Sequence, residues 1–315
     1  RARTNYWYET ASNINAFNPV YSGSNVTFGT PYKLNTKELE QTGVYLQDQF
    51  AYENWRFSLG LRQDWLETSN LSRLDDTRTG QDREKLTKNA GLLYLFDNGI
   101  APYISYSESF DPSLLSDSNG DPIEPTEGTQ YEAGIKYQPE GDDILLSAAV
   151  FDIRQDNVAL YNSTTTAYDP AGSLESRGLE LEARGRVNDN IDLIASYTYT
   201  DTQYDAPGDS KDGKQSMQVP EHMASLWGHY QFLSGPLNGL GLGGGVRYVG
   251  ETWANVTNTQ KVPDYAVLDF ALNYDLAYVG FDDLDFRLNV NNLLDEEYVA
   301  SCYTLANCYF CDARS

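Results

Sequence analysis

Cysteine and histidine are the side chains of this sequence best suited to covalent or metal chemistry, and both are scarce. All three cysteines, Cys302, Cys308 and Cys311, fall in the C-terminal tail. Clustered cysteines in a chain that otherwise has none suggest a local crosslink made in an oxidising compartment. No histidine is near them in the sequence, which makes a zinc site a poor interpretation. His222 and His229, the only histidines, would face opposite sides of a shared strand, so they predict no metal site.

Catalytic motifs are missing from the sequence. It contains no G-x-S-x-G, no H-E-x-x-H and no glycine-rich loop followed by a helix. The glycines of Gly241–Gly245 fall in a predicted strand, where glycine favours close backbone approach or a bend. We therefore expect no catalytic residues, no enzyme activity and no covalently bound cofactor.

The composition leaves two protein classes open. The formal net charge of −24 does not suit nucleic acid, because binding phosphates requires clustered Lys and Arg. Mean hydropathy is −0.53, and no stretch approaches the roughly 20 apolar residues of a membrane-spanning helix. A secreted soluble β-protein and an outer-membrane barrel both remain. The 24 tyrosines favour the barrel, because amphipathic rings are enriched at membrane–water interfaces.

Two kinds of connection alternate along the chain. Short turns, some with the Asn-Gly type of pair that supplies positive φ angles, are predicted at 53–55, 97–99, 139–143, 188–190, 234–239 and 279–283. Longer stretches rich in Ser, Thr, Asn, Asp, Gly and Pro are predicted as loops at 11–35, 69–85, 111–127, 155–173, 204–217, 252–261 and 294–315.

The segments between these connections predict strands. Residues 268–275 and 286–291 alternate apolar and polar side chains. A period of two places one face of a strand in an apolar medium and the other in a polar one. About thirteen strands are predicted, at 1–10, 36–52, 55–68, 86–96, 100–110, 128–138, 143–154, 174–187, 191–203, 218–233, 239–251, 262–277 and 283–293.

Short turns at one end and long loops at the other are typical of outer-membrane barrels, whose short turns face the periplasm. A sandwich or propeller would have shorter strands and less regular loop lengths. Bacterial single-chain barrels have an even number of strands. The odd count therefore predicts one more strand after residue 315 and, for a large barrel, others before residue 1.

Seven segments are more specific than this alternation. They are QTGVYLQDQF (41–50), YLFDNGIAPYISYSESFDPS (94–113), EGTQYEAGIKY (127–137), ESRGLELEARG (175–185), ASYTYTDTQY (195–204), VPEHMASLWGHYQF (219–232) and LNVNNLLDEEYVASCYTLANCYF (288–310). In this order they resemble the siderophore receptors among the TonB-dependent transporters. The last two are most similar to the ferrichrome-type receptors, which take up ferric hydroxamates.

The resemblance implies an all-β fold, an antiparallel transmembrane barrel of 22 strands closed by an N-terminal plug domain. Residues 1–315 would be its C-terminal part, with plug and last strand outside this sequence. The implied function is TonB-energised uptake of a ferric siderophore, the transported ligand, across the bacterial outer membrane. Lipid and lipopolysaccharide would surround the barrel, and the family implies a possible secondary role as a phage or bacteriocin receptor.

The resemblance also implies a disulfide between Cys302 and Cys308 that tightens the last external loop. Cys311 departs from the family pattern. It is either an unpaired thiol or a competitor of Cys308 for Cys302.

Aromatic side chains of the loops are the implied siderophore ligands. Tyr303, Tyr309 and Phe310 flank the cysteines, and Trp7 and Tyr8 are at the loop end of the first strand. Aromatic faces with hydroxyl groups suit the organic shell of a hydroxamate complex. The alternative for each is an interface aromatic of the barrel. Four further tyrosines are assigned to the barrel wall: Tyr103, Tyr106, Tyr197 and Tyr199.

Three rival functions remain open at this stage. A passive porin would conduct ions and have no plug. A soluble secreted protein would purify without detergent. A TonB-dependent receptor for another cargo, such as cobalamin or a sugar, would share the fold and differ only in its ligand.

Overall fold

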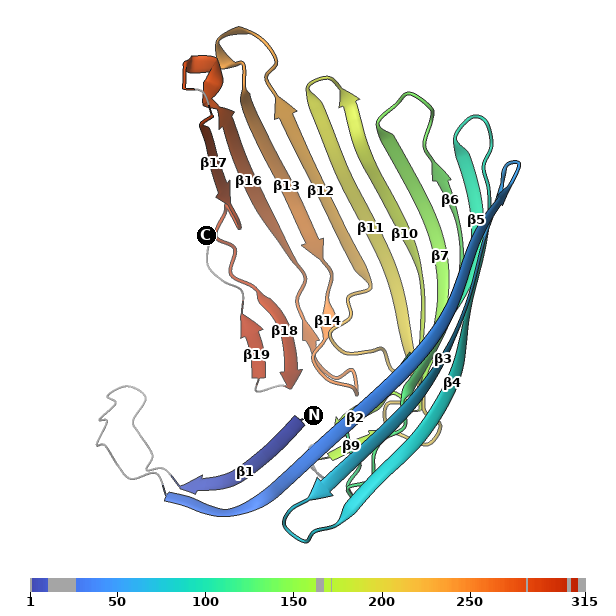
Figure 1. The fold of residues 1–315 in the computed structure, drawn as a ribbon. Helices are drawn as coiled ribbons and strands as arrows, with labels where there is room; N and C mark the ends of the chain where they lie inside the picture. The colour runs from blue at the N-terminus through green and yellow to red at the C-terminus, as the bar shows by residue number, and fades with distance from the viewer. Residues whose placement is uncertain are drawn as a thin grey trace.

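The computed structural model describes residues 2–10, 27–162, 167–170, 172–281, 283–304 and 307–310. Thirteen strands form one antiparallel sheet whose neighbours follow one another along the chain (Figure 1). They are β1 (Ala2–Thr10), β2 (Thr27–Tyr52), β3 (Trp55–Ser72), β4 (Arg78–Tyr94), β5 (Ile100–Asp111), β6 (Thr126–Tyr137), β7 (Ile144–Asp156), β10 (Ser173–Asn188), β11 (Ile191–Asp205), β12 (His222–Gln231), β13 (Leu240–Val249), β16 (Tyr265–Asp275) and β17 (Asp285–Val290). The predicted all-β antiparallel architecture and the count of thirteen strands are confirmed.

Smaller elements occupy the connections. Two 3₁₀ turns, η1 (Gly235–Leu237) and η2 (Leu276–Val279), belong to short turns. Three two-stranded hairpins belong to long connections: β8 (Ala159–Asn162) with β9 (Ala167–Pro170), β14 (Thr252–Trp253) with β15 (Lys261–Val262), and β18 (Val299–Thr304) with β19 (Asn307–Phe310). In the part of the chain that the structure describes, no helix is both long and apolar enough to cross a membrane.

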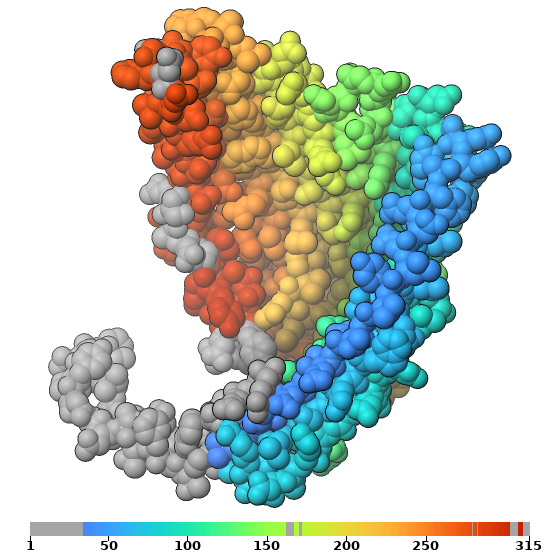
Figure 2. Space-filling view, in the orientation of Figure 1, coloured from blue at the N-terminus to red at the C-terminus, as the bar shows by residue number. Residues whose placement is uncertain are grey.

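The sheet curves around a hollow, as a section of barrel wall does (Figure 2). The short turns gather at one end, at the top of Figure 1, and the long connections gather at the other. We call this second end the loop end. The predicted asymmetry of turns and loops is therefore present in the fold.

The two faces of the sheet differ in polarity. One row of paired residues on the outer face is apolar and runs across five strands through Phe57, Leu92, Ile104, Ala133 and Val150. The adjacent row projects to the opposite face, which lines the hollow, and contains Ser58, Gly91, Ser105 and Glu132. Apolar side chains outside and polar ones inside are what a strand between lipid and a wet lumen requires.

Towards the loop end the outer face becomes charged. Arg154 pairs with Asp156 at 3.1 Å, with Glu175 at 2.9 Å and with Asp205 at 3.1 Å, and Arg177 pairs with Glu175 at 3.2 Å. Exposed ion pairs of this kind contribute little to stability. Their position shows where the apolar band of the wall ends.

The four wall tyrosines lie in strands of the sheet, as predicted. Tyr106, Tyr197 and Tyr199 share the outer face, whereas Tyr103 points into the lumen and donates a hydrogen bond to Glu132 at 2.6 Å.

The histidines lie on opposite faces of β12, which confirms the prediction. His222 is on the outer face at the loop end, 2.9 Å from the hydroxyl of Tyr197. His229 faces the lumen, where its Nε2 lies 3.0 Å from Oδ1 of Asn273. The predicted close approach at Gly241–Gly245 is also confirmed: a Cβ on Gly243 or Gly245 would clash with the ring of Trp227.

Two predicted loops are wrong. Residues 69–85 are mostly strand, because β3 continues to Ser72 and β4 starts at Arg78, and β2 starts at Thr27, inside the predicted loop 11–35. At about 3.3 Å per residue, β2 extends far beyond the roughly 30 Å of a bilayer core. We call residues 34–43, 62–72 and 78–87 the ribbon. Its polar composition resembles a loop because it stands clear of the apolar band.

Candidate ligand-binding site

The last described hairpin, β18–β19, packs against two other connections at the loop end. Cys302 and Cys308 form the expected disulfide. Cys302 is buried with Ala254 and Val262 of the β14–β15 hairpin, and Val299 packs against them. Burial of these side chains joins two hairpins that have no strand pairing with each other.

Polar bonds join the third connection, between β11 and β12, to the same group. The side-chain amide of Gln218 donates to the carbonyl of Cys302 at 2.7 Å, and its backbone N–H donates to the carbonyl of Trp253 at 3.0 Å. The indole N–H of Trp253 donates to Oε1 of Gln215 at 2.5 Å, and the amide of Asn258 donates to the carbonyl of Gln215 at 3.0 Å. We call residues 213–221, 252–262, 299–304 and 307–310 the C-terminal rim.

A cavity of about 630 Å³ borders this rim. One wall is the start of β16 with Tyr265, and another is the segment 295–299, which contains Tyr298. The two tyrosine rings stack with their centroids 3.9 Å apart. Phe310 of β19 also lines the cavity. The volume falls in the range of small-molecule sites, about 300–1,000 Å³.

The fold brings these walls together on the lumen side. Tyr265 and Asp269 are four residues apart on β16 and share its lumen face, where Arg247 pairs with Asp269 at 2.9 Å. The backbone N–H of Asn292 donates to Oδ1 of Asp269 at 3.0 Å. The chain leaving β17 is thereby held against the lumen face of β16, and Tyr298 reaches Tyr265.

Of the five predicted ligand aromatics, the structure places one in this cavity. Phe310 lines it and is 76% exposed, whereas Tyr309 is 64% exposed and does not belong to the lining. The backbones of Trp7 and Tyr8 lie in β1 and that of Tyr303 in β18, but their side chains are outside the described residues, as is all of Cys311.

Sequence reasoning missed most of the cavity lining. Tyr265 and Tyr298 come from separate strand ends, and only the fold brings them into contact. Four carboxyl side chains also line the cavity, namely Asp264, Asp295, Glu296 and Glu297. The sequence DEEY at 295–298, shortly before the cysteines, could have indicated the cavity lining. Adjacent carboxylates are too common in this acidic chain, however, for these residues to be singled out.

The opposite part of the loop-end rim is the ribbon, and the 112–125 connection covers its lumen face. We call residues 112–125 the strap. Lys37 donates to the carbonyl of Leu114 and, at 2.9 Å, to the hydroxyl of Ser116. The side chains of Thr79 and Gln81 donate to the carbonyls of residues 120 and 123, at 3.0 and 2.9 Å.

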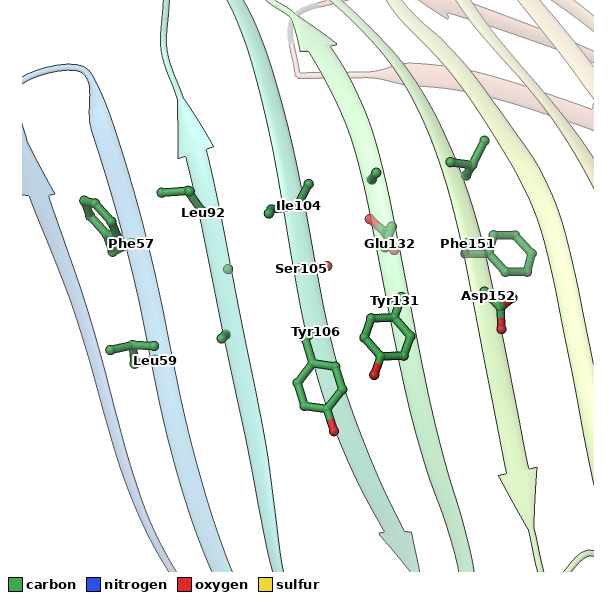
Figure 3. A pocket seen from close by; sticks show the side chains of 14 residues that line it. Phe57, Leu59, Leu92, Ile104, Ser105, Tyr106, Tyr131, Glu132, Phe151 and Asp152 are labelled. Atoms are coloured by element: carbon green, nitrogen blue, oxygen red, sulfur yellow. The ribbon is translucent and has the colours of Figure 1, made fainter.

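A larger hollow, of about 690 Å³, lies elsewhere, on the wall itself (Figure 3). Phe57, Leu92, Ile104, Tyr106 and Tyr131 surround it, all on the apolar outer face. A soluble ligand in the hollow of the barrel does not reach this face. The cavity beside the C-terminal rim, in contrast, lies on the lumen side of the wall.

Two ion pairs shift pKa values at the loop end, one from the buried Lys211 and one from the exposed Lys261. The hydrogen bond from Lys211, with an N–O distance of 2.7 Å, lowers the pKa of Asp209, and the carboxylate of Glu251 raises the pKa of Lys261. Among the described residues, no group of three or more His, Cys, Asp or Glu side chains is arranged to hold a metal ion.

Comparisons with known proteins agree on one family. Residues 1–293 match the family described as TonB dependent receptor-like, beta-barrel. The chain is 44% identical to the ferrioxamine B receptor of Salmonella typhimurium over 99% of its own length and 44% of the relative's. It is 38% identical to the ferrichrome outer membrane transporter/phage receptor of Escherichia coli, over 97% of this chain and 42% of the relative. The siderophore receptor PiuA of Acinetobacter baumannii superimposes with a TM-score of 0.77 and 26% identity, over 92% of this chain and 43% of PiuA.

Proposed function

The chain belongs to the TonB-dependent receptor β-barrel family, an outer-membrane family, and on that premise we propose that it is part of a receptor and active transporter for a ferric hydroxamate siderophore. The observation that carries the proposal is the similarity, over nearly the whole chain, to receptors named for ferrioxamine B and for ferrichrome. Both ligands are hydroxamates, and their iron arrives already chelated, so a receptor needs no metal ligand of its own. The chain spans less than half the length of these relatives.

The cavity beside the C-terminal rim suits such a ligand. A ferric hydroxamate presents an organic shell with amide groups, which aromatic faces and tyrosine hydroxyls bury and hydrogen-bond. The Tyr265–Tyr298 stack and Phe310 offer such a surface at the loop end of the lumen. We keep Trp7, Tyr8, Tyr303 and Tyr309 as proposed contacts, because the strands that contain them reach the same end of the barrel.

Transport itself would require parts beyond residues 1–315. In the proposed mechanism the ligand binds at the loop end and orders loops and plug. TonB then drives the plug to rearrange and releases the complex into the periplasm. The residues described here would bind and orient the ligand and line its path. Their role is that of a receptor, and none of it requires catalysis.

Ligand titration tests the proposal. Five tryptophans and 24 tyrosines supply intrinsic fluorescence, which a ferric complex quenches on binding. We expect saturable quenching of the intact, detergent-purified receptor by ferrichrome and ferrioxamine, and none by ferric enterobactin, a catecholate. Binding of the catecholate alone would overturn the hydroxamate assignment. Ion conductance without ligand, by an intact protein that has no plug, would instead favour the passive porin.

A second role has one specific observation in its favour. The name of the Escherichia coli relative includes phage receptor. The exposed ribbon and C-terminal rim are the surfaces that a phage or a bacteriocin would contact. Phage or bacteriocin adsorption to cells that make this receptor, compared with cells that lack it, tests this role separately from iron uptake.

A further inference from the structure

Gln218, in the connection between β11 and β12, has an unusual backbone conformation for its residue type. Its φ is +65°, in the left-handed region that disfavours side chains with a Cβ. The other described non-glycine residues with positive φ are Asn or Asp, which tolerate this region, except Glu53 in the tight turn between β2 and β3. Gln218 is exposed, so dense packing does not impose the conformation. Such a conformation persists where other contacts hold it.

Two hydrogen bonds hold Gln218, and they reach two different hairpins. Its backbone N–H donates to the carbonyl of Trp253 in β14 at 3.0 Å, and its side-chain amide donates to the carbonyl of Cys302 in β18 at 2.7 Å. The hairpins β14–β15 and β18–β19 are separate two-stranded sheets, and their direct contact is the apolar cluster of Ala254, Val262 and Cys302. Apolar contacts are non-directional, whereas N–H···O bonds restrict both distance and angle. Gln218 therefore fixes a geometry that the apolar cluster alone would leave loose.

Both hairpins continue into the lining of the cavity beside the C-terminal rim. Strand β15 is followed directly by residues 263–265, which line the cavity. Strand β18 starts at Val299 and β19 ends at Phe310, and both residues line it as well. Gln218 is not part of the lining. It can affect a ligand in the cavity through the positions of the two hairpins.

Other bonds attach the connection that contains Gln218 to β14–β15. The backbone N–H of Gln215 donates to Oδ1 of Asn258 at 2.7 Å, and the amide of Asn258 donates back to the carbonyl of Gln215 at 3.0 Å. The indole N–H of Trp253 donates to the side chain of Gln215. Loss of the Gln218 side chain should therefore leave the connection on β14–β15 and release β18–β19.

We propose that Gln218 is a positioning residue of the proposed ligand site. It holds β18–β19 in place against β14–β15, so that two sides of the cavity are set before the ligand arrives. The inference rests on the proposed function and adds to it a residue that does not touch the ligand. A preformed site binds more tightly, because the ligand does not have to order it. The left-handed backbone is retained because it lets one residue reach both carbonyls.

Removal of the amide tests the inference. In Gln218→Met the side chain keeps its length and loses its donor. We expect ferrichrome and ferrioxamine B to bind the intact receptor about three- to tenfold more weakly in fluorescence titrations, the effect of one lost hydrogen bond. Hydrogen exchange at residues 299–304 should accelerate by a similar factor in the free receptor, and saturating ligand should restore the slow exchange.

The matched control is Gln81→Met. It also removes a bond from a glutamine side chain to a backbone carbonyl at the loop end, that of Ile123 in the strap, at 2.9 Å. Its affinity for both ligands and its exchange at residues 299–304 should stay at the wild-type values. An equal loss of affinity in this control would show a general response of the loop end and would overturn the inference.

A second variant separates positioning from stability. Gln218→Gly loses the same amide but adopts a positive φ without strain. Exchange at residues 213–221 should therefore be no faster than in Gln218→Met, whereas ligand affinity should fall as far. Wild-type affinity in either variant would overturn the inference. Failure of both ligands to bind the wild type would instead count against the proposed function, and exchange at residues 299–304 still tests the hold of Gln218 on β18 without any ligand.

Discussion

The ribbon and the C-terminal rim both lie at the loop end of the barrel wall. The interactions that stabilise the ribbon internally differ from those that stabilise the C-terminal rim. In the ribbon the ladder between β2 and β3 continues without a break from Asn35 to Tyr52, and that between β3 and β4 runs from Trp55 to Leu71. The C-terminal rim has no comparable ladder. Its hairpins pair over only a few residues, and the disulfide, a small buried cluster and side-chain hydrogen bonds join them.

This difference predicts which substitutions should destabilise the ribbon and which should destabilise the C-terminal rim. Backbone pairing is spread over many residues, so the ribbon tolerates the loss of one side chain, although the strap depends on individual polar contacts. The C-terminal rim concentrates its connections in Cys302, Gln218 and Trp253. A single substitution there should loosen three connections at once, and with them the cavity.

Removing the disulfide should have the largest effect. For Cys302→Ser/Cys308→Ser, a closed loop of this size predicts a loss of about 2–3 kcal/mol in the chain-entropy picture. We expect hydrogen exchange to accelerate by about 50- to 100-fold at residues 252–262 and 299–304 and to stay unchanged in the strap. Ligand affinity should fall as well, because Phe310 loses its position.

Reductant supplies the control for this experiment. It should reproduce the effect in the wild type and add nothing to the double variant. Faster exchange in the strap as well as in the C-terminal rim would show that the two rims form one cooperative unit, and the contrast between them would be wrong.

Removing the charge of Lys37 should have the next largest effect, on the ribbon side. Lys37→Met deletes the hydrogen bonds to the carbonyl of Leu114 and the hydroxyl of Ser116, at a cost of about 1–2 kcal/mol for partly buried bonds from a charged donor. The strap should become sensitive to limited proteolysis, whereas residues 299–304 keep their protection. Lys88→Met removes the same charge from the outer face of β4 and should leave the strap intact. A strap that resists protease in Lys37→Met would show that backbone contacts suffice to hold it.

How far the sequence predicts this fold depends on the medium around each segment. In β16 and β17 alternation is clear because one face meets an apolar medium and the other a polar lumen. In the ribbon that contrast is lost. Asn70 and Thr79 face the strap and Glu40 and Glu67 face outward, so polar residues occupy both faces of genuine strands. The pattern there is that of a loop, and the prediction of residues 69–85 failed for this reason.

The lining of the candidate cavity could be predicted only in part, because some of its residues meet through contacts between distant parts of the chain. The resemblance to the ferrichrome-type receptors predicted the Cys302–Cys308 disulfide and a ligand role for Phe310, because these residues lie within one short segment of the sequence. Tyr265 and Tyr298 meet because the chain after β17 folds back along β16, held by the bond from Asn292 to Asp269. No local pattern encodes a contact of that kind, so the cavity became apparent only in three dimensions.

A third prediction separates two contributions within the C-terminal rim. Trp253→Phe keeps an aromatic ring beneath Lys261, whose Nζ lies 5.1 Å from the ring centroid, but loses the N–H that donates to Gln215. We expect a local loss of about 1 kcal/mol, measured as faster exchange at residues 213–218 and 252–262. Lys261→Met removes the cation–π contact and the ion pair with Glu251 but keeps the hydrogen bond of Trp253, and should cost less at this exposed position, about 0.5 kcal/mol. The reverse order would mean that charge, not the indole N–H, holds this hairpin.

Acid should have the smallest effect, and it should act on two turns, one next to the C-terminal rim and one at the tip of the ribbon. A hydrogen bond from Lys211 is the largest cause that lowers the pKa of Asp209, and hydrogen bonds from Ser72 and Thr77 lower the pKa of Asp75 in the turn of the ribbon. A carboxyl group whose pKa is lower in the folded state stabilises the fold above its unfolded pKa. That stabilisation is lost as the pH falls through the folded pKa. Both turns should therefore keep their order down to about pH 4 and loosen below it.

Separate substitutions show whether these two acid responses are independent. Asp209→Asn should abolish the pH dependence of exchange at residues 206–217 and leave the turn at 73–77 unchanged, and Asp75→Asn should do the opposite. Asparagine keeps the acceptor oxygen but not the charge, so each turn should then behave at pH 6 as the wild type does in acid. The response at 206–217 should shrink in Lys211→Met, because the side-chain donor to Asp209 is gone while the backbone N–H of residue 211 still donates to it. Loss of both responses from one substitution would mean that the rims are coupled through the strands between them, and the contrast drawn from their construction would fail.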